Sequence, residues 1–267
     1  MRWLRRRAEP STEDLMALAR EHAKAERYEE ALAIWEPLAR AGHARACNNI
    51  GACFAEGMGV ERNPSLAERW LSLAAEAGDP VGQRNLATLF FKGEGIEPDH
   101  HRALALYLMA AEQGDAISQD MLSWMLLEDE EIPADHAEAL RWAERAATQG
   151  VASSMTRIGM LHHNALGVPR DPEAAAFWWR LGAERSDADG QAMLGAALML
   201  GNGVARDPLA ALTWLLRAEA GGSALAGRFL PAARAALDEA AQHEAAQRAA
   251  EPLPEPGPLP ALPGDSA

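Results

Sequence analysis

Small, apolar and polar residues recur along this chain with a period of 36 residues. One column is glycine at every position but one: Gly42, Gly78, Gly114, Gly150, Ser186 and Gly222. A second column is alanine throughout: Ala31, Ala67, Ala103, Ala139, Ala175 and Ala211. Because the columns keep step without insertion or deletion, we predict tandem units of a single length.

Each unit predicts two helices. In its first half, small and aliphatic residues lie four positions apart, which indicates one face of a helix. The small column is Ala46, Gly82, Ser118, Ser154 and Gly190, and the aliphatic column is Ile50, Leu86, Leu122, Ile158 and Leu194. In the second half, the alanine column is followed three residues later by Ile34, Trp70, Leu106, Trp142, Trp178 and Trp214. The small columns permit close helix approach, and we expect the tryptophans in the core.

The loop inside each unit has its own signature, such as Gly57-Met58-Gly59-Val60 or Gly201-Asn202-Gly203-Val204. Glycine tolerates the positive φ of a helix C-cap. A column of N-cap residues follows the loops: Asn63, Asp99, Asp135, Asp171 and Asp207. Their side-chain oxygens accept hydrogen bonds from the first turn of the second helix. Proline then occupies the first helical position three times, at Pro64, Pro172 and Pro208, where its missing N–H costs nothing.

Two units depart from this pattern. The third has Asp129-Glu130-Glu131-Ile132 where glycines are expected, and the fourth has Ala165 and Ser186 in glycine columns. Since the loops keep their length, we expect the fold to be unchanged.

One helix pair cannot bury its apolar face alone, but a stack can. We therefore predict an all-α protein, an α-solenoid of stacked antiparallel helix pairs. The predicted segments are a basic N-terminal segment (1–10), a capping helix pair resembling a tetratricopeptide repeat (11–42), five repeats (43–78, 79–114, 115–150, 151–186 and 187–222), a C-terminal capping helix (223–250) and a proline-rich tail (251–267). We expect the tail to be disordered or in the polyproline II conformation.

Residues 43–222 resemble the Sel-1-like repeat family, a relative of the tetratricopeptide repeats. The resemblance rests on motifs such as Gly167-Val168 with Asp171, Ala175 and Trp178-Trp179. Plain tetratricopeptide units repeat every 34 residues and lack the Gly-x-Gly-Val loop. The resemblance implies a right-handed superhelix that serves as an adaptor or scaffold in signalling or complex assembly.

The composition of the chain indicates which class of partner it binds. The chain has 25 basic and 39 acidic residues, a formal net charge of −14 and a pI near 5.0. Such a chain repels phosphate backbones, so we expect a protein or peptide partner and no nucleic acid. Cys47 and Cys53 are too far apart on one predicted helix to form a disulfide. Two cysteines that stay reduced are typical of a protein in a reducing compartment. The sequence has no secretory signal and no apolar run long enough to span a membrane, so we expect a cytoplasmic protein. The sequence does not predict its oligomeric state.

Catalytic motifs are missing from the sequence, so we expect no enzyme, no cofactor and no metal. Two groups of residues allow a second interpretation. The histidines are expected to be surface residues and the acidic run a solvated loop, but each could also bind a ligand. His100 and His136, with His101 and Asp135, form a conceivable weak metal site. The acidic run 128–131 could bind a cation or an arginine-rich partner.

The sharper hypothesis concerns first-helix positions that the repeat does not specify. At 100° per residue, a set of large apolar side chains lies opposite the small and aliphatic columns: Phe91, Trp124, Leu127, Met160 and Met199. We predict that this apolar stripe lines a concave groove and binds a protein segment. The competing interpretation is that neighbouring first helices bury the stripe against each other. Two other functions remain open, a hydrolase-like enzyme, as assigned to some relatives, and a self-assembling structural component.

Overall fold

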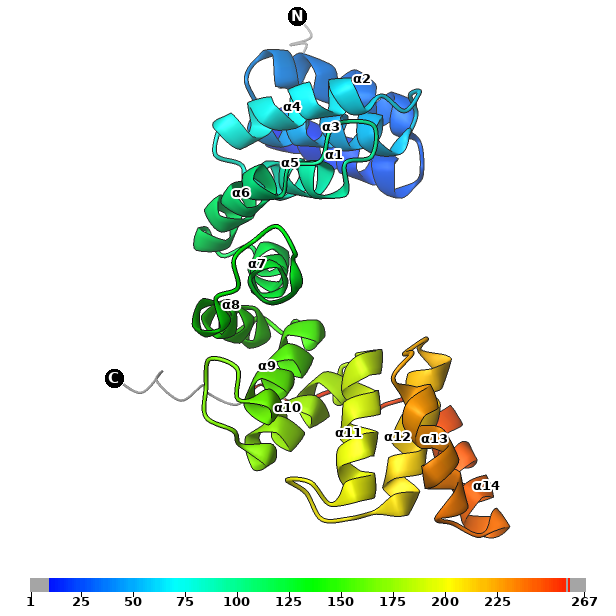
Figure 1. The fold of residues 1–267 in the computed structure, drawn as a ribbon. Helices are drawn as coiled ribbons and strands as arrows, with labels where there is room; N and C mark the ends of the chain where they lie inside the picture. Colours follow the sequence, from blue (N-terminus) through cyan, green and yellow to red (C-terminus); the bar gives the residue numbers. More distant parts are fainter. Residues whose placement is uncertain (1–9, 258, 260–267) are drawn as a thin grey trace, which may run out of the picture. The chain divides into compact units, whose positions relative to one another are not determined.

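The structure, a computed structural model, describes residues 10–257 and 259. Across these residues the chain forms fourteen α-helices and no strand (Figure 1). The helices are α1 (Thr12–Lys24), α2 (Tyr28–Arg40), α3 (Ala44–Glu56), α4 (Pro64–Glu76), α5 (Pro80–Lys92), α6 (His100–Glu112), α7 (Ala116–Glu128), α8 (His136–Thr148), α9 (Ala152–Asn164), α10 (Pro172–Glu184), α11 (Ala188–Leu200), α12 (Pro208–Ala220), α13 (Ala226–Ala235) and α14 (Glu239–Ala250). The predicted all-α fold of stacked helix pairs is confirmed. Most of the predicted basic segment, residues 1–9, lies outside the described residues.

The second helix of each repeat begins where its N-cap predicts. Asn63 accepts from the backbone N–H of Leu66 at 3.0 Å, and the aspartates at the equivalent positions do the same. Proline occupies the first turn of α4, α10 and α12. Side chains close in the sequence therefore set these helix starts.

The first helices end in the left-handed conformation. Gly57, Gly93 and Gly201 close α3, α5 and α11 in this way. Ala165 adopts the same conformation at the end of α9, with φ 57° and ψ 42°. In the third repeat the carboxylate of Asp129 instead accepts from the backbone N–H of Glu131 at 2.9 Å. A side chain thus holds the turn where the glycines are missing.

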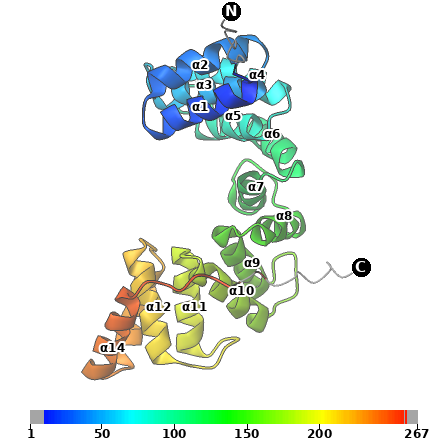
Figure 2. The same ribbon diagram turned by 180° about the vertical axis from the view of Figure 1, so that it is seen from behind.

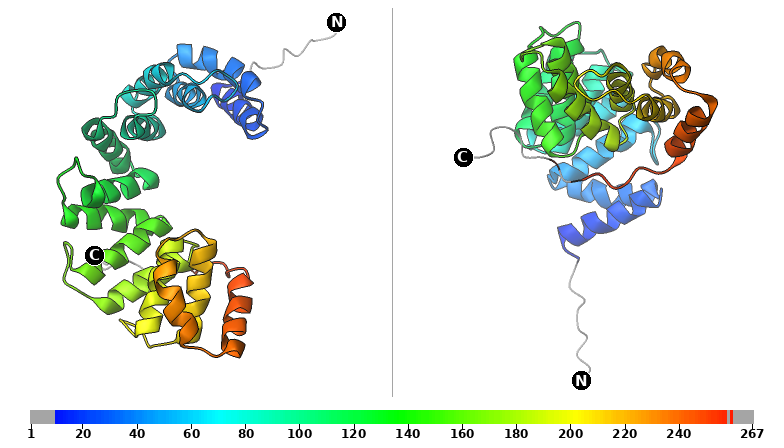
Figure 3. Two further views of the ribbon diagram at one scale, coloured as in Figure 1. Left: turned by 45° about the vertical axis from the view of Figure 1, so that its right-hand side comes forward. Right: turned by 90° about the horizontal axis from the view of Figure 1, so that it is seen from below.

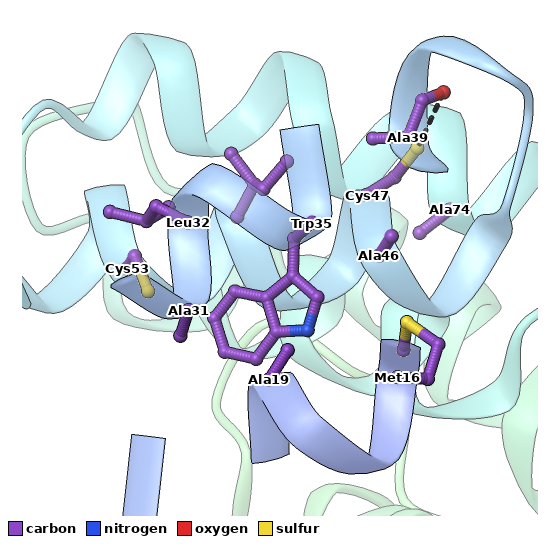
Figure 4. Close-up of a cluster of buried hydrophobic side chains, with 11 residues drawn as sticks. Met16, Ala19, Ala31, Leu32, Trp35, Ala39, Ala46, Cys47, Cys53 and Ala74 are labelled. Carbon is purple, nitrogen blue, oxygen red and sulfur yellow. Dashed lines mark hydrogen bonds between the residues drawn. The ribbon is translucent and has the colours of Figure 1, made fainter. Parts of the chain in front are cut away.

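The chain divides into two compact units, residues 1–118 and 119–267. In the N-terminal unit, α1 packs on α2, α3 on α4 and α5 on α6. The indole of Trp35 lies at the centre of the first core cluster, against Met16, Ala19 and Ala31 (Figure 4). The thiol of Cys47 donates to the carbonyl oxygen of Ala39 at 3.9 Å.

Small residues bring the helices of this unit close together. A Cβ atom added to Gly51 would lie 2.7 Å from Cγ of Leu71, and one added to Gly82 would lie 2.6 Å from Cβ of Ala74. Both distances are below van der Waals contact, so a larger residue would push the helices apart. The columns of small residues therefore serve the close approach that we predicted from the sequence.

In the C-terminal unit, α9 packs on α10 and α11 on α12, and α13 and α14 both pack on α12 (Figure 3). Of the tryptophan column, Trp142 and Trp178 are buried, whereas Trp70 and Trp214 are half-buried. The predicted capping segment 223–250 forms two helices. The break falls before Asp238, whose carboxylate caps α14 by accepting from the N–H of Ala241 at 2.8 Å.

Beyond α14 the described residues of the proline-rich segment form neither helix nor strand. Figure 2 shows this segment returning from α14 across α12 towards α10. The last residues of the predicted tail, 260–267, lie outside the described residues.

Candidate interaction surface

The five residues of the predicted stripe lie on four first helices. Phe91 is near the end of α5 in the N-terminal unit. The others belong to the C-terminal unit: Trp124 and Leu127 on α7, Met160 on α9 and Met199 on α11. All five are half-buried, so none is among the fully buried core residues and none is fully exposed.

The stripe consists of two columns of the repeat. Trp124 and Met160 occupy one column, whose other members are Ala52, Thr88 and Ala196. Phe91, Leu127 and Met199 occupy the column three residues further on, together with Ala55 and His163.

The second of these columns faces the partner helix within its own repeat. The ring of Phe91 lies 4.9 Å from that of His100 on α6, between centroids. The ring of His163 lies 5.4 Å from that of Trp179 on α10. Met199 packs against core residues that include Leu212 on α12. These side chains therefore help to join the two helices of a repeat.

The first column has no such structural requirement for size. Alanine or threonine occupies it in three of the five repeats, so the repeat fold forms without a large side chain there. Trp124 also donates from its indole N–H to the Glu128 carboxylate, 3.1 Å away on the same helix. Trp124 and Met160 are thus the members of the stripe that the fold itself does not explain.

A ladder of polar contacts joins the N-terminal ends of successive first helices. The N-cap aspartate of one first helix also accepts from a side chain on the preceding first helix. In the N-terminal unit, Arg45 donates to Asp79 at 2.6 Å and Arg84 to Asp115 at 2.7 Å. This hydrogen bond raises the pKa of Arg45. The aspartates therefore fix both the start of a helix and its distance from the previous repeat.

The ladder continues in the C-terminal unit with one reversal. Thr156 donates its hydroxyl to Asp187, the N-cap of α11, at 2.6 Å. The residue before α9, however, is Val151, which has no side-chain cap. Asp120 on α7 supplies the carboxylate instead, and accepts from Arg157 at 2.6 Å and from Ser153 at 3.0 Å. We did not predict this ladder, although the column that contains Asp79, Asp115 and Asp187 is its visible signal in the sequence.

The geometry gives little support to a metal site, a reactive cysteine or a binding site at the acidic run. No three His, Cys, Asp or Glu side chains among the described residues are placed to hold a metal ion. Cys47 and Cys53 are free and buried, and burial raises the pKa of the Cys53 thiol to about 11. A thiol with so high a pKa is a poor nucleophile. In the acidic run 128–131, Asp129 is buried and occupied in the turn.

No helix within the described part of the chain combines the length and apolar character needed to cross a lipid bilayer.

Solved structures that this chain resembles include two proteins with the same kind of repeat. A Sel1 repeat protein from Oxalobacter formigenes is 28% identical, with a TM-score of 0.78, over 91% of this chain and 99% of that one. The protein c5321 of uropathogenic Escherichia coli, a protective antigen with an SLR fold, is 26% identical with a TM-score of 0.82. The match covers 90% of this chain but 52% of the E. coli protein, so this chain spans about half its length. No curated protein matches the chain.

The Sel1 repeat profile matches five consecutive segments, residues 44–79, 80–115, 116–151, 152–187 and 188–223. Each segment begins at the first residue of a first helix, and the first four segments end at the residue just before the next first helix. Five matched repeats, the Gly-x-Gly-Val loops and the packed helix pairs lead to one conclusion. This chain belongs to the Sel1 repeat family.

Proposed function

We propose that this protein is a non-catalytic scaffold that binds a segment of another protein along the first-helix side of its repeats. Trp124 and Met160 form the centre of the surface, and Leu127 and Met199 of the same C-terminal unit border it. The observation that supports the proposal is the size of Trp124 and Met160 at a position where the other repeats have alanine or threonine. Large side chains that a fold does not need are typical of an interface.

The chemistry of these residues suits recognition. Tryptophan and methionine are enriched at the centres of protein interfaces, and methionine adapts its shape to the partner. Both side chains are already half-buried, so binding removes only their remaining surface from water. That surface is worth on the order of 1–2 kcal/mol, enough for an anchor of moderate affinity.

Charge favours one kind of partner. The chain carries a net charge of −14, and Glu128 lies beside Trp124 at the proposed site. An apolar segment flanked by lysine or arginine would complement this surface and associate faster at low salt. The two buried free thiols are typical of proteins in a reducing compartment, which accords with action in the cytoplasm.

Selection from a peptide library displayed on phage, against the immobilised full chain, would test the proposal. Selected peptides are expected to be apolar and basic. Their affinity for a Trp124→Ala/Met160→Ala variant is expected to fall at least about ten-fold. Thermal melting of the variant checks that its fold is intact.

A matched control is the Leu73→Ala/Met109→Ala variant. It removes two apolar side chains that are 51% and 47% exposed on the second helices α4 and α6. It should bind the peptides as the native chain does. Peptides that bind the Trp124/Met160 variant with native affinity would show that the first-helix surface is not the binding site.

A further inference from the structure

The proline-rich segment after α14 lies on the C-terminal unit as an extended chain. Its first residue, Glu251, has φ −70° and ψ 142°, the values of a polyproline II helix. Pro252, Pro254 and Pro256 alternate with other residues after it. Figure 3 shows the segment leaving α14 as an open strap, and it continues towards the second helix α10.

Three features place this segment beside the second helices: a shared cavity and two contacts. Leu253 lines a cavity of about 310 Å³ together with Trp214 of α12 and Glu184 of α10. The guanidinium of Arg185, which follows α10, donates to the carbonyl oxygen of Gly257 at 2.7 Å. Leu259 packs against the buried cluster that contains Trp178.

This arrangement matches the way in which proteins recognise polyproline segments. Such a segment has no internal hydrogen bonds, so its carbonyl oxygens are open to donors such as Arg185. Recognition of such a segment places its apolar side chains beside aromatic residues. Here Leu253 and Trp214 line the same cavity. The segment buries little of its surface on the helices, because Pro252, Pro254 and Pro256 are all exposed.

We propose that the second-helix surface of the C-terminal unit, formed by Trp178, Arg185 and Trp214, is a binding groove for extended proline-rich segments with leucines six residues apart. The chain's own residues 253–257 and 259 occupy this groove as a tethered, exchangeable ligand. A tether raises the local concentration of a ligand to about the millimolar range, so even a weakly held tail keeps competitors out. The groove lies on other helices than the first-helix surface proposed above, and its test is independent of that proposal.

The charge of the groove indicates how a foreign segment could displace the tail. Glu184 and Glu255 line the same cavity, so the tail brings a second carboxylate to a site that already has one. Like charges that share a site disfavour each other. A segment with lysine in place of Glu255 is therefore expected to bind more tightly than the native tail sequence.

The experiment uses the full chain with the substitutions Leu253→Ser and Leu259→Ser. These substitutions weaken the binding of the tail to the groove and change no residue of a helix. A fluorescein-labelled peptide of residues 250–260 is titrated in, and its anisotropy is followed. The peptide is expected to bind this variant at least about ten-fold more tightly than the native chain, because the native tail competes. A second variant, Pro254→Gly/Pro256→Gly, loosens the extended conformation and is expected to change the affinity in the same direction.

Two further measurements identify the groove. Adding Arg185→Ala to the leucine variant is expected to weaken peptide binding several-fold, since it removes a charged donor. An unlabelled Glu255→Lys peptide should compete better than the native sequence, and a peptide with both leucines replaced by serine should not compete. Equal affinity of the labelled peptide for the native chain and both tail variants, or binding that ignores Arg185→Ala, would overturn the proposal and leave the tail as a fixed structural strap.

Discussion

Arg157 on α9 donates to the carboxylate of Asp120 on α7 at 2.6 Å, and their side chains are only 10% and 18% exposed. The same carboxylate accepts from the hydroxyls of Ser153 and Ser154. One side chain therefore links two neighbouring repeats and serves the N-terminus of α9, where Val151 cannot. In the other contacts of the ladder the carboxylate is the N-cap of the following first helix, as at Asp79, Asp115 and Asp187. Here the carboxylate belongs to the preceding first helix.

Replacing Asp120 by Asn is expected to lower the free energy of unfolding by about 3 kcal/mol, because it leaves the Arg157 guanidinium buried without a counter-ion. Chemical denaturation of the two proteins measures the difference. Asp189→Asn is the matched control, since that carboxylate contacts Ser223 at an exposed site. Its effect should stay within about 0.5 kcal/mol.

Exchanging the two halves of this contact should restore part of the loss. The double substitution Asp120→Thr/Val151→Asp copies the arrangement of Thr156 and Asp187 in the next repeat. We expect it to be more stable than Asp120→Asn, because α9 regains an N-cap worth about 1 kcal/mol. If the double variant is no more stable, the ladder does not contribute through helix capping.

Ala165 holds a backbone conformation that glycine adopts in the equivalent loops. Its Cβ atom costs about 1 kcal/mol at φ 57°, so Ala165→Gly is expected to stabilise the protein by about that amount. Gly201→Ala, at the same position of the next repeat, makes the reverse change and should destabilise to a similar extent. Thermal melting of both variants checks the prediction, which fails if both shift the melting temperature in the same direction.

The two glycines of the last Gly-x-Gly-Val loop have different roles. A Cβ atom on Gly201 meets nothing closer than 3.4 Å, whereas one on Gly203 would lie 1.8 Å from the carbonyl oxygen of Pro172. Gly203→Ala therefore forces the loop away from the preceding repeat and is expected to cost about 3 kcal/mol, well above the cost at Gly201. Similar denaturation midpoints for the two variants would rule out this steric role.

Burial of Cys53 predicts a pH dependence at high pH. The pKa of its thiol is raised from 9.0 to about 11 in the folded chain, so the unfolded chain loses this proton first. The contribution of Cys53 to stability is therefore complete below about pH 9 and declines as pH rises towards about 11. Urea denaturation of the native chain and Cys53→Ala at several pH values measures it. The difference in stability between the two proteins should shrink through this window, and a constant difference would contradict the prediction.

Much of the fold follows from the sequence because its signals are local. The helix starts at Asn63 and Asp171 depend on side chains three residues from the groups they cap, and the helix ends depend on single glycines. A period of 36 residues then repeats these signals, so the number of repeats and the helix pairs are determined by the sequence alone.

The tertiary structure decided the contacts between residues that no local pattern connects. Asp120 and Arg157 are 37 positions apart, and their pairing depends on how far one first helix lies from the next. Packing also gave the residues of the apolar stripe different roles. Phe91 contacts α6, whereas the fold does not require a side chain as large as that of Trp124. The course of the proline-rich segment was equally beyond prediction. A chain without internal hydrogen bonds takes its position from the surface that receives it, here Arg185 and Trp214.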